Sequence, residues 1–345
     1  MYSHQHHEKS QDLETNEKYG NYINDAIILK KETNGIINLF ETKTNGNTVY
    51  NLFNHFSKLI VTEQIRFEEA IWLENTKSGA IIWGDQYKGS GYKYDYCSMY
   101  PYIMQLEKNI YPIKKGQFIK LTQESFENCI NNNKLEFGIY RCMIKKSDNP
   151  ISKKLFRWNP KNFYTHIDII QAHKLNLNIK LLKDRQPNFL YYSDVCCLPG
   201  CHIFRAYVDF VFPLKKKKLP RAKAFLTMLW GVLGQRSDLG YKILRNDPSS
   251  IELDSIKYRK LNGTLYRTNY ARTVPFVLAY GRELICATML PFIDNIMRCH
   301  TDGFISKIPI NFPTGQNLGE LKYEGYAKCV IIHNSNDIEG EFTLD

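Results

Sequence analysis

The chain has 345 residues, 43% of them hydrophobic, so it can bury a sizeable core as one large unit or as two domains. Lys and Arg outnumber Asp and Glu, 46 against 35, and the formal net charge of +11 favours a polyanionic partner such as nucleic acid. Residues 1–20 lack the apolar core of a secretory signal, and Arg282 and Glu283 interrupt the most apolar stretch, 276–293, which argues against a membrane span and indicates a soluble protein.

The first third of the chain predicts a polar start followed by helices and a strand. Residues 1–48 are rich in Asn, Lys, Thr and Glu with little periodicity, which indicates a polar lead-in. Apolar residues recur at helical spacing over 49–74 and predict one or two amphipathic helices. An aromatic-rich strand is predicted over 92–97, and Pro101 opens a helix-like stretch. Asp95 therefore lies near the end of a strand.

Strands and helices alternate through the middle of the chain. A strand is predicted over 135–145, and Thr165 with Asp168 forms an N-cap pair for a helix that precedes a strand at 178–182. Helices over 202–212 and 222–234, joined by a basic turn, predict an antiparallel pair.

The last third predicts a β excursion, a long helix and a second strand pair. Residues 237–270 are polar and rich in turn signals, which predicts a β-hairpin. A long apolar helix runs from Pro275 to about Asp294, and a strand, turn and strand follow over 296–308 with Asp302 at the turn.

The nine cysteines are scattered without a paired C-x-x-C spacing, which favours a reducing intracellular compartment. Cys196, Cys197, Cys201 and His202 lie close together in sequence. A zinc site at Cys196 and Cys201 and a few idle thiols both fit this spacing, and idle thiols are the commoner case.

Three segments concentrate residue types that carry chemistry. Residues 95–101 read DYCSMYP and place a carboxylate at a strand end before a turn. In the segment 223–231, KAFLTMLWG, the Lys, Thr and Trp fall at i, i+4 and i+7, so one helix face can present an ammonium and an aromatic surface. Residues 298–303, RCHTDG, hold a further carboxylate in a turn. A lone aspartate is usually a capping or turn residue, a lysine run is usually a solvated face, and a tryptophan at helical spacing is usually a core residue. The combination of all three segments in this order indicates a functional site instead.

The three segments resemble motifs A, B and C of family B DNA polymerases, particularly the viral and organellar branch that includes protein-primed enzymes. The resemblance covers about residues 68–335. The first segment matches D-x-x-S-L-Y-P except for Met99 at the Leu position. In the second, Trp230 replaces a Tyr, and Thr227 and Met228 stand where the family usually has Asn and Ser. The third keeps only the Thr-Asp core of Y-x-D-T-D-S, with His300 in place of the first Asp.

Two further segments agree in order with the family. Residues 279–282, AYGR, resemble the arginine-containing element of the palm helix, and 319–324, GELKYE, resemble the strand after motif C.

The resemblance implies an α+β right-hand palm, with an antiparallel sheet carrying both motif aspartates and a helical-hairpin fingers region. An exonuclease domain is expected to be absent and the thumb absent or incomplete. The implied divisions are a polar lead-in at 1–48, a palm part with motif A and an inserted subdomain at 49–201, fingers with motif B at 202–236, a hairpin insertion at 237–270, and a palm part with motif C at 271–345.

The implied activity is template-directed DNA polymerisation, in which deoxynucleotides are added to a primer 3′-hydroxyl by two-metal catalysis with Mg²⁺, or Mn²⁺ in its place. Tyr100 would lie under the sugar and exclude a 2′-hydroxyl by steric clash. The implied site residues are Asp95 and Asp302 as catalytic, Asp95, Tyr96 and Asp302 as metal-binding, Ser98, Met99, Tyr100, Lys223 and Thr227 as nucleotide-binding, and Trp230, Gly231, Arg282 and Lys322 as DNA-binding, with His300, Lys218 and Arg221 as further candidates.

Primer-template DNA and deoxynucleoside triphosphates are the implied partners, with a terminal protein primer or a second polymerase chain as candidates and no membrane. The implied setting is intracellular, in viral, plasmid or organellar replication. Because His300 removes one negative charge from the site, a degenerate or truncated polymerase that binds nucleic acid without turnover is the first alternative. A different palm enzyme, such as an RNA polymerase or a reverse transcriptase, is the second, and Tyr100 as sugar gate favours the selection of deoxynucleotides.

Overall fold

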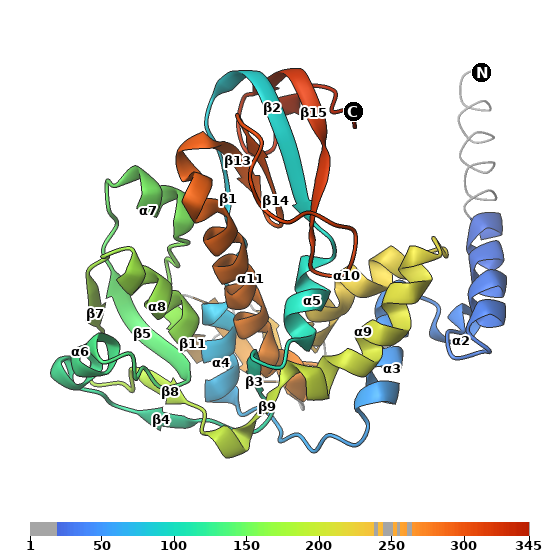
Figure 1. Ribbon diagram of the computed structural model, residues 1–345. Helices are drawn as coiled ribbons and strands as arrows, with labels where there is room; N and C mark the ends of the chain where they lie inside the picture. Colours follow the sequence, from blue (N-terminus) through green and yellow to red (C-terminus); the bar gives the residue numbers. More distant parts are fainter. Residues whose placement is uncertain (1–18, 238–240, 244–250, 254–255, 261–263, 345) are drawn as a thin grey trace, which may run out of the picture.

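A computed structural model describes residues 19–237, 241–243, 251–253, 256–260 and 264–344 (Figure 1). The described residues include a six-stranded antiparallel sheet of order β1-β13-β14-β2-β15-β16. Its strands are β1 (Ile82–Gly84), β2 (Tyr87–Tyr96), β13 (Ile296–His300), β14 (Gly303–Ser306), β15 (Leu321–Ile332) and β16 (Ile338–Glu339). Strands from the first and the last third of the chain therefore alternate in one sheet.

Residues 19–76 contain more helix than the composition of the predicted lead-in suggests, and residues 1–18 of that lead-in lie outside the described residues. Residues 19–32 are helical, and α2 (Leu39–Thr42), α3 (Asn45–Ser57) and α4 (Phe67–Thr76) follow. The two helices α3 and α4 confirm the helical periodicity of 49–74. Ala26 and Leu29 are fully buried, so residues 19–48 differ from the expected polar lead-in because one helical stripe is apolar enough to join the core.

The middle of the chain forms a separate, smaller sheet. Within the described residues it has five strands, β4 (Gln117–Ile119), β5 (Gly138–Ile144), β6 (Phe163–Thr165), β7 (Ile179–Leu181) and β8 (Phe189–Tyr191), with helices α6 (Gln123–Asn131), α7 (Pro150–Leu155) and α8 (His166–Lys174). The predicted strand at 135–145 and the Thr165 helix start are confirmed, since Thr165 and Asp168 complete a reciprocal capping box.

Two long helices form a hairpin beside the core. They are α9 (Gly200–Lys216) and α10 (Ala222–Leu233), which pack against each other. The buried side of α9 carries Ile203, Phe204, Tyr207, Val208, Val211 and Leu214, and this stripe holds the helix against the core. A short strand pair, β3 (Ile110–Pro112) with β9 (Cys197–Pro199), and the 3₁₀ turn η1 (Asp194–Cys196) precede the hairpin.

The predicted excursion at 237–270 contains three described strands rather than a simple hairpin, β10 (Tyr241–Ile243), β11 (Ile251–Leu253) and β12 (Ile256–Lys260), ordered β10-β12-β11. The turn signals at 246–248 and 262–263 lie outside the described residues. After the turn η2 (Asn269–Thr273), helix α11 (Val274–Met289) and η3 (Leu290–Asn295) confirm the predicted apolar helix.

Helix α11 runs through the centre of the molecule (Figure 1) and is apolar on most of its surface because it packs against α5 (Met99–Gln105), α8 and α10. By length and composition the stretch Asn269–Asn295 could cross a membrane, but 61% of its most apolar window is buried inside the protein, as expected of a core helix.

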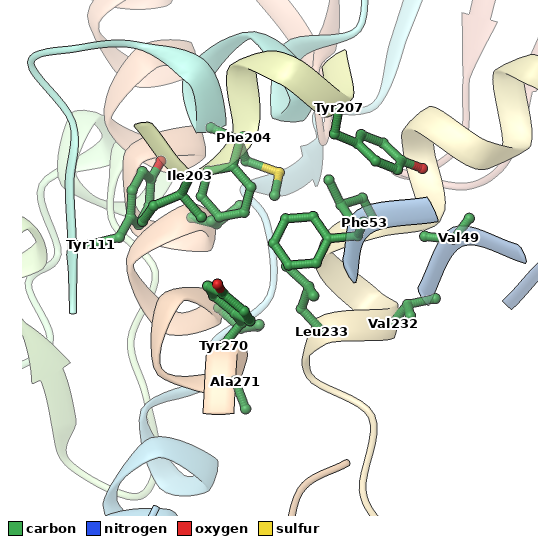
Figure 2. Close-up of a cluster of buried hydrophobic side chains, with 14 of the residues drawn as sticks. Val49, Phe53, Tyr111, Ile203, Phe204, Tyr207, Val232, Leu233, Tyr270 and Ala271 are labelled. Carbon is green, nitrogen blue, oxygen red and sulfur yellow. The ribbon is translucent and has the colours of Figure 1, made fainter. Parts of the chain in front are cut away.

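The main hydrophobic cluster joins helices that are far apart in sequence. Phe53 of α3 lies 5.8 Å from Phe204 of α9 and 4.9 Å from Tyr270 of η2, measured between ring centroids (Figure 2). Leu233 of α10 completes the contact. Large aromatic side chains bury enough area to hold these helices together, so the α9–α10 hairpin is fixed to the N-terminal helices.

Candidate functional site

The two motif aspartates meet at one end of the six-stranded sheet. Asp95 is the second-last residue of β2, and Asp302 lies in the turn between β13 and β14. Asp95 pairs in register with Gly303, and the main-chain N–H of Tyr96 donates to the carbonyl of Asp302 at 2.9 Å. The strand-end placement of Asp95 and the turn placement of Asp302 are as the sequence predicts.

Gly303 leaves room for the carboxylate of Asp95. A Cβ at this position would lie 2.7 Å from Oδ1 of Asp95 and 2.9 Å from the carbonyl oxygen of Tyr94. These separations are too short for a carbon atom, so any larger residue must displace the carboxylate or the strand. Glycine is therefore required here by close approach.

Changing Gly303 to alanine is expected to lower any reaction that uses Asp95 by about 100-fold, because a shift of about 1 Å in a catalytic group has that order of cost. Gly46→Ala is the control, since nothing lies within 4 Å of its added Cβ. Steady-state rates of both variants check the expectation. Equal rates for Gly303→Ala and the unaltered chain would contradict it.

Burial disfavours the ionised forms of both aspartates. Burial, the neighbouring Asp302 and Glu324 raise the pKa of Asp95 to about 7, against the opposing effects of Lys93 and Lys223. Burial also raises the pKa of Asp302, which is countered by His300 and Lys223. Oxygen ligands that repel one another suit a divalent cation, and Mg²⁺ commonly binds one or two carboxylates together with substrate phosphates. The pair Asp95 and Asp302 fits that pattern.

The metal-free protein is expected to lose stability as pH rises from about 4 to about 7. The pKa of Asp95 is about 7 in the folded state against the ordinary aspartate value of 3.8, so the folded state binds this proton more tightly than the unfolded state does. Asp95→Asn is therefore expected to raise the melting temperature at pH 8 and to leave it nearly unchanged at pH 4. Thermal melts at both pH values in a chelator check this. A larger gain at pH 4 than at pH 8 would contradict it.

The turn after Asp95 is held by contacts from two directions. Ser98 has a left-handed backbone, φ 57°, and α5 begins at Met99. The N–H of Cys97 donates to the carbonyl of Glu320 at 2.8 Å, and the N–H of Gly319 donates to the carbonyl of Cys97 at 2.8 Å. The Met99 side chain points into the core, so only its main chain can face a ligand here.

Tyr96 contributes its main chain and not its side chain. Its hydroxyl is buried and lies 2.6 Å from Oγ1 of Thr288. Any part in metal binding must therefore come from the peptide group beside Asp302.

Tyr100 is enclosed by two helices. Its ring centroid lies 5.6 Å from that of Trp230 on α10, with the planes tilted by 41°. On the other side, a Cβ added to Gly281 of α11 would lie 2.8 Å from Cε1 of Tyr100. Burial raises the pKa of Tyr100 to about 12, so the phenol stays neutral at ordinary pH. The ring is held in one place by packing.

The exposed face of α10 presents the remaining residues of the second segment. Lys223 and Thr227 are exposed, and Lys223 acts electrostatically on both Asp95 and Asp302. Thr227 Oγ1 donates back to the carbonyl of Lys223 at 3.1 Å. Nothing lies within 4 Å of a Cβ added to Gly231, which leaves open space beside the helix.

Lys215 is a site residue that the sequence did not single out. It lies at the end of α9, and its Nζ is 2.6 Å from Oγ of Ser98. Lys218, the candidate residue in the basic run 215–218, is exposed. The available signal was helical spacing, because Lys215 continues the stripe of Val208 and Val211 by i+7 and i+4.

Arg282 is not available for the DNA contact that the sequence predicted. Its side chain is 5% exposed, and its guanidinium is 2.9 and 3.1 Å from the two oxygens of Asp168. It also donates to the carbonyls of Ser78 and Gly79 at 2.8 and 3.1 Å. The buried capping-box carboxylate of α8 needs a partner, so Arg282 joins α11 to α8 instead.

Three other candidates lie around the site in different ways. Arg221 bonds Asp25 at 2.7 Å and so ties the start of α10 to helix 19–32. Lys322 pairs in register with Asp95 and lies 3.3 Å from a carboxylate oxygen of Glu324. His300 of β13 pairs in register with Gly303 of β14, and Gly303 in turn pairs with Asp95 of β2.

The nine cysteines, all in described ranges, are free thiols. Among the described residues no group of three or more His, Cys, Asp and Glu side chains could hold a metal ion, so a zinc site at Cys196 and Cys201 has no support.

Comparison with known proteins finds a sequence similarity to a viral DNA polymerase and a similarity of fold to phi29 DNA polymerase. No family model matches the chain. It is 23% identical over 263 residues to the DNA polymerase of Acidianus bottle-shaped virus (isolate Italy/Pozzuoli), covering 72% of this chain and 35% of that protein. Its fold matches phi29 DNA polymerase in complex with primer-template DNA and incoming nucleotide, with a TM-score of 0.62 and 14% identity over 92% of this chain and 58% of that one. The structure of phi29 DNA polymerase complexed with single-stranded DNA matches with a TM-score of 0.63 and 15% identity, over 92% of this chain and 57% of that one. The resemblance stated from the motifs is confirmed, and the chain spans about a third of the curated relative.

Proposed function

From the fold of phi29 DNA polymerase and the sequence similarity to a viral DNA polymerase, we propose that this chain is a template-directed DNA polymerase in a viral replication context. The observation that carries the proposal is the meeting of Asp95 and Asp302 at one end of the sheet, beside the ammonium groups of α9 and α10. The six-stranded sheet would be the palm and the α9–α10 hairpin the fingers.

The reaction would be attack of a primer 3′-hydroxyl on a deoxynucleoside triphosphate, with release of pyrophosphate. Asp95 and Asp302 would hold the cations through carboxylate oxygens. When bound, Mg²⁺ supplies positive charge that stabilises both the attacking oxygen and the leaving pyrophosphate. The chain's share is to hold these groups in line, since positioning accounts for much of such a rate gain.

The triphosphate would lie between the two helices of the hairpin. Lys223 on α10 and Lys215 on α9 approach the aspartate end from separate helices, and Lys215 reaches the turn at Ser98. An ammonium group that acts on both carboxylates, with a second ammonium at the adjoining turn, suits a ligand that carries both metal and phosphate. Ser98 lies where its main chain could donate to a phosphate oxygen.

Replacing Tyr100 by alanine is expected to raise incorporation of ribonucleotides relative to deoxynucleotides by about 10- to 200-fold, the range for steric discrimination in a packed pocket. The reason is that Trp230 and Gly281 hold the ring rigidly. Tyr100→Phe is the matched control, because it keeps the ring and removes only the hydroxyl. Competition assays with both nucleotide types measure the ratio. An unchanged ratio in Tyr100→Ala would remove the sugar-gate role.

The deciding experiment is extension of a labelled, recessed primer by the purified chain with Mg²⁺ or Mn²⁺. Extension that requires the template and the cation, and stops opposite the template end, supports the proposal. A folded chain that binds the DNA and never extends it would support the alternative of a binding protein without turnover. His300, in place of an acidic residue, is the observation that favours this second candidate.

Primer-template DNA and deoxynucleoside triphosphates are the proposed partners. A terminal protein primer and a second polymerase chain are the further candidates, and priming assays on single-stranded DNA without an oligonucleotide primer separate them.

A further inference from the structure

A basic cavity lies at the outer edge of the six-stranded sheet, beside the edge strand β1. It has a volume of about 220 Å³ and lies between β1 and the segment around α7. Four cations and two indole rings contribute to its wall: Lys146, Lys153, Lys154, Arg157, Trp83 and Trp158. Such a wall offers both charge and flat apolar surface.

The cations of this cavity exceed the anions beside it. Lys154 lies 2.7 Å from a carboxylate oxygen of Asp85, and Lys153 lies 3.4 Å from one of the fully exposed Asp148. Lys146 and Arg157 are exposed and form no ion pair with any described carboxylate. Two cations are therefore free to bind an anionic ligand.

The aromatic side of the cavity is pre-arranged. The Nζ of Lys154 lies 4.5 Å from the ring centroid of Trp83, and Trp158 packs edge-on against Phe156 at 5.0 Å. Both tryptophans are half-buried, and neither indole N–H has an acceptor among the described residues. Aromatic rings next to cations are the usual platform for an unpaired nucleobase and its phosphate.

The cavity's size favours one unit of an extended ligand. Pockets that enclose a whole drug-sized molecule measure about 300–1,000 Å³. A space of about 220 Å³ is smaller, so it fits a single base of a strand whose other units lie outside.

The position of the cavity connects it to the aspartate site. Ile82 of β1 pairs in register with His300 of β13, and the N–H of Thr301 donates to the carbonyl of Ile81 at 3.1 Å. Ile81 and Ile82 line the cavity, so its wall begins one strand away from the turn that carries Asp302 (Figure 1).

We infer that this cavity binds one nucleotide of single-stranded DNA, through Lys146 and Arg157 on the phosphate and the indole platform on the base. That the strand is the unpaired template ahead of the primer end rests on the proposed function. DNA binding by the cavity can be measured without it.

The test compares the double variant Lys146→Ala/Arg157→Ala with Lys120→Ala, an exposed lysine directly after β4 of the smaller sheet and outside the cavity. Fluorescence anisotropy measures binding to a blunt duplex and to the same duplex with a single-stranded 5′ overhang of about ten nucleotides. The unaltered chain and Lys120→Ala should bind the overhang substrate more tightly than the blunt one. The double variant should bind the overhang substrate about tenfold more weakly and the blunt duplex with little change in affinity. Its slope of log binding constant against log salt concentration on the overhang substrate should be smaller by about 1.4.

Equal affinities of the double variant and the unaltered chain for the overhang substrate would overturn the inference, and so would an equal loss on both substrates. If the double variant melts at a lower temperature than the unaltered chain, the single variants Lys146→Ala and Arg157→Ala replace it in the same comparison. Overhang binding that depends on these cations in a chain that never extends a primer would keep the inference and remove the proposed function. Primer extension by the unaltered chain, together with unchanged overhang binding in the double variant, would keep the proposed function and remove the inference.

Discussion

Asparagine at position 95 or 302 is expected to reduce primer extension by at least about 1,000-fold while the fold is kept. Each substitution removes one negative charge and one of the two carboxylates that could hold the cations, and loss of such electrostatic stabilisation costs about 100- to 1,000-fold even for one neutral donor. The shapes of Asp and Asn are nearly the same, so packing around β2 and the β13–β14 turn should not change.

Single-nucleotide incorporation under single-turnover conditions measures the loss. Asp209→Asn on the exposed side of α9 is the matched control and should keep full activity. Titration of Mg²⁺ followed by thermal melting gives a second readout, since the unaltered chain should be stabilised by the cation and both active-site variants much less. Activity within tenfold of the unaltered chain in either variant would place the chemistry elsewhere.

Replacing Arg272 by alanine is expected to destabilise the fold by about 3–5 kcal/mol, the largest stability effect that we expect from a single side chain. Arg272 is fully buried, and its Nε and Nη2 lie 2.7 and 2.8 Å from the two oxygens of Glu69 on α4. It also donates to the carbonyls of Glu63 and Gln64, and Tyr192 donates to Glu69 at 2.9 Å. Removing the arginine leaves a buried carboxylate without its counter-charge.

Urea unfolding followed by circular dichroism measures the change in free energy. The double variant Arg272→Met/Glu69→Leu is expected to recover more than half of the loss, because it removes both charges and keeps apolar volume. A loss below about 1 kcal/mol in Arg272→Ala would contradict the expectation. A double variant as unstable as the sum of the two single variants would show that the ion pair is not the cause.

Part of the secondary structure followed from local patterns in the sequence. Helices α3, α4, α9, α10 and α11 have the predicted periodicity, and Asp95 and Asp302 lie at the predicted strand end and turn. These features depend on residues within one or two turns of each other, so the local chain determines them. The chemistry proposed for the two aspartates likewise came from residue type and motif order.

Partner choice was decided by the tertiary structure. The sequence predicted Arg282 as a DNA contact, yet its guanidinium is paired with Asp168, which lies more than one hundred positions earlier in the chain. Lys215 looked like one lysine among four, and only the approach of α9 to Ser98 distinguishes it. Residues 19–48 looked like a lead-in until Ala26 and Leu29 were found against the core.

The amino-acid sequence by itself therefore determined which residues could do chemistry and on which local element each one lies. Only the tertiary structure decided which of the charges remain free for a ligand, because a buried charge must be paired by whatever side chain the fold brings to it. Asp95 and Asp302 lie at the end of the sheet with raised pKa values and form no ion pair with a described side chain, whereas Arg282 is paired with Asp168 inside the protein.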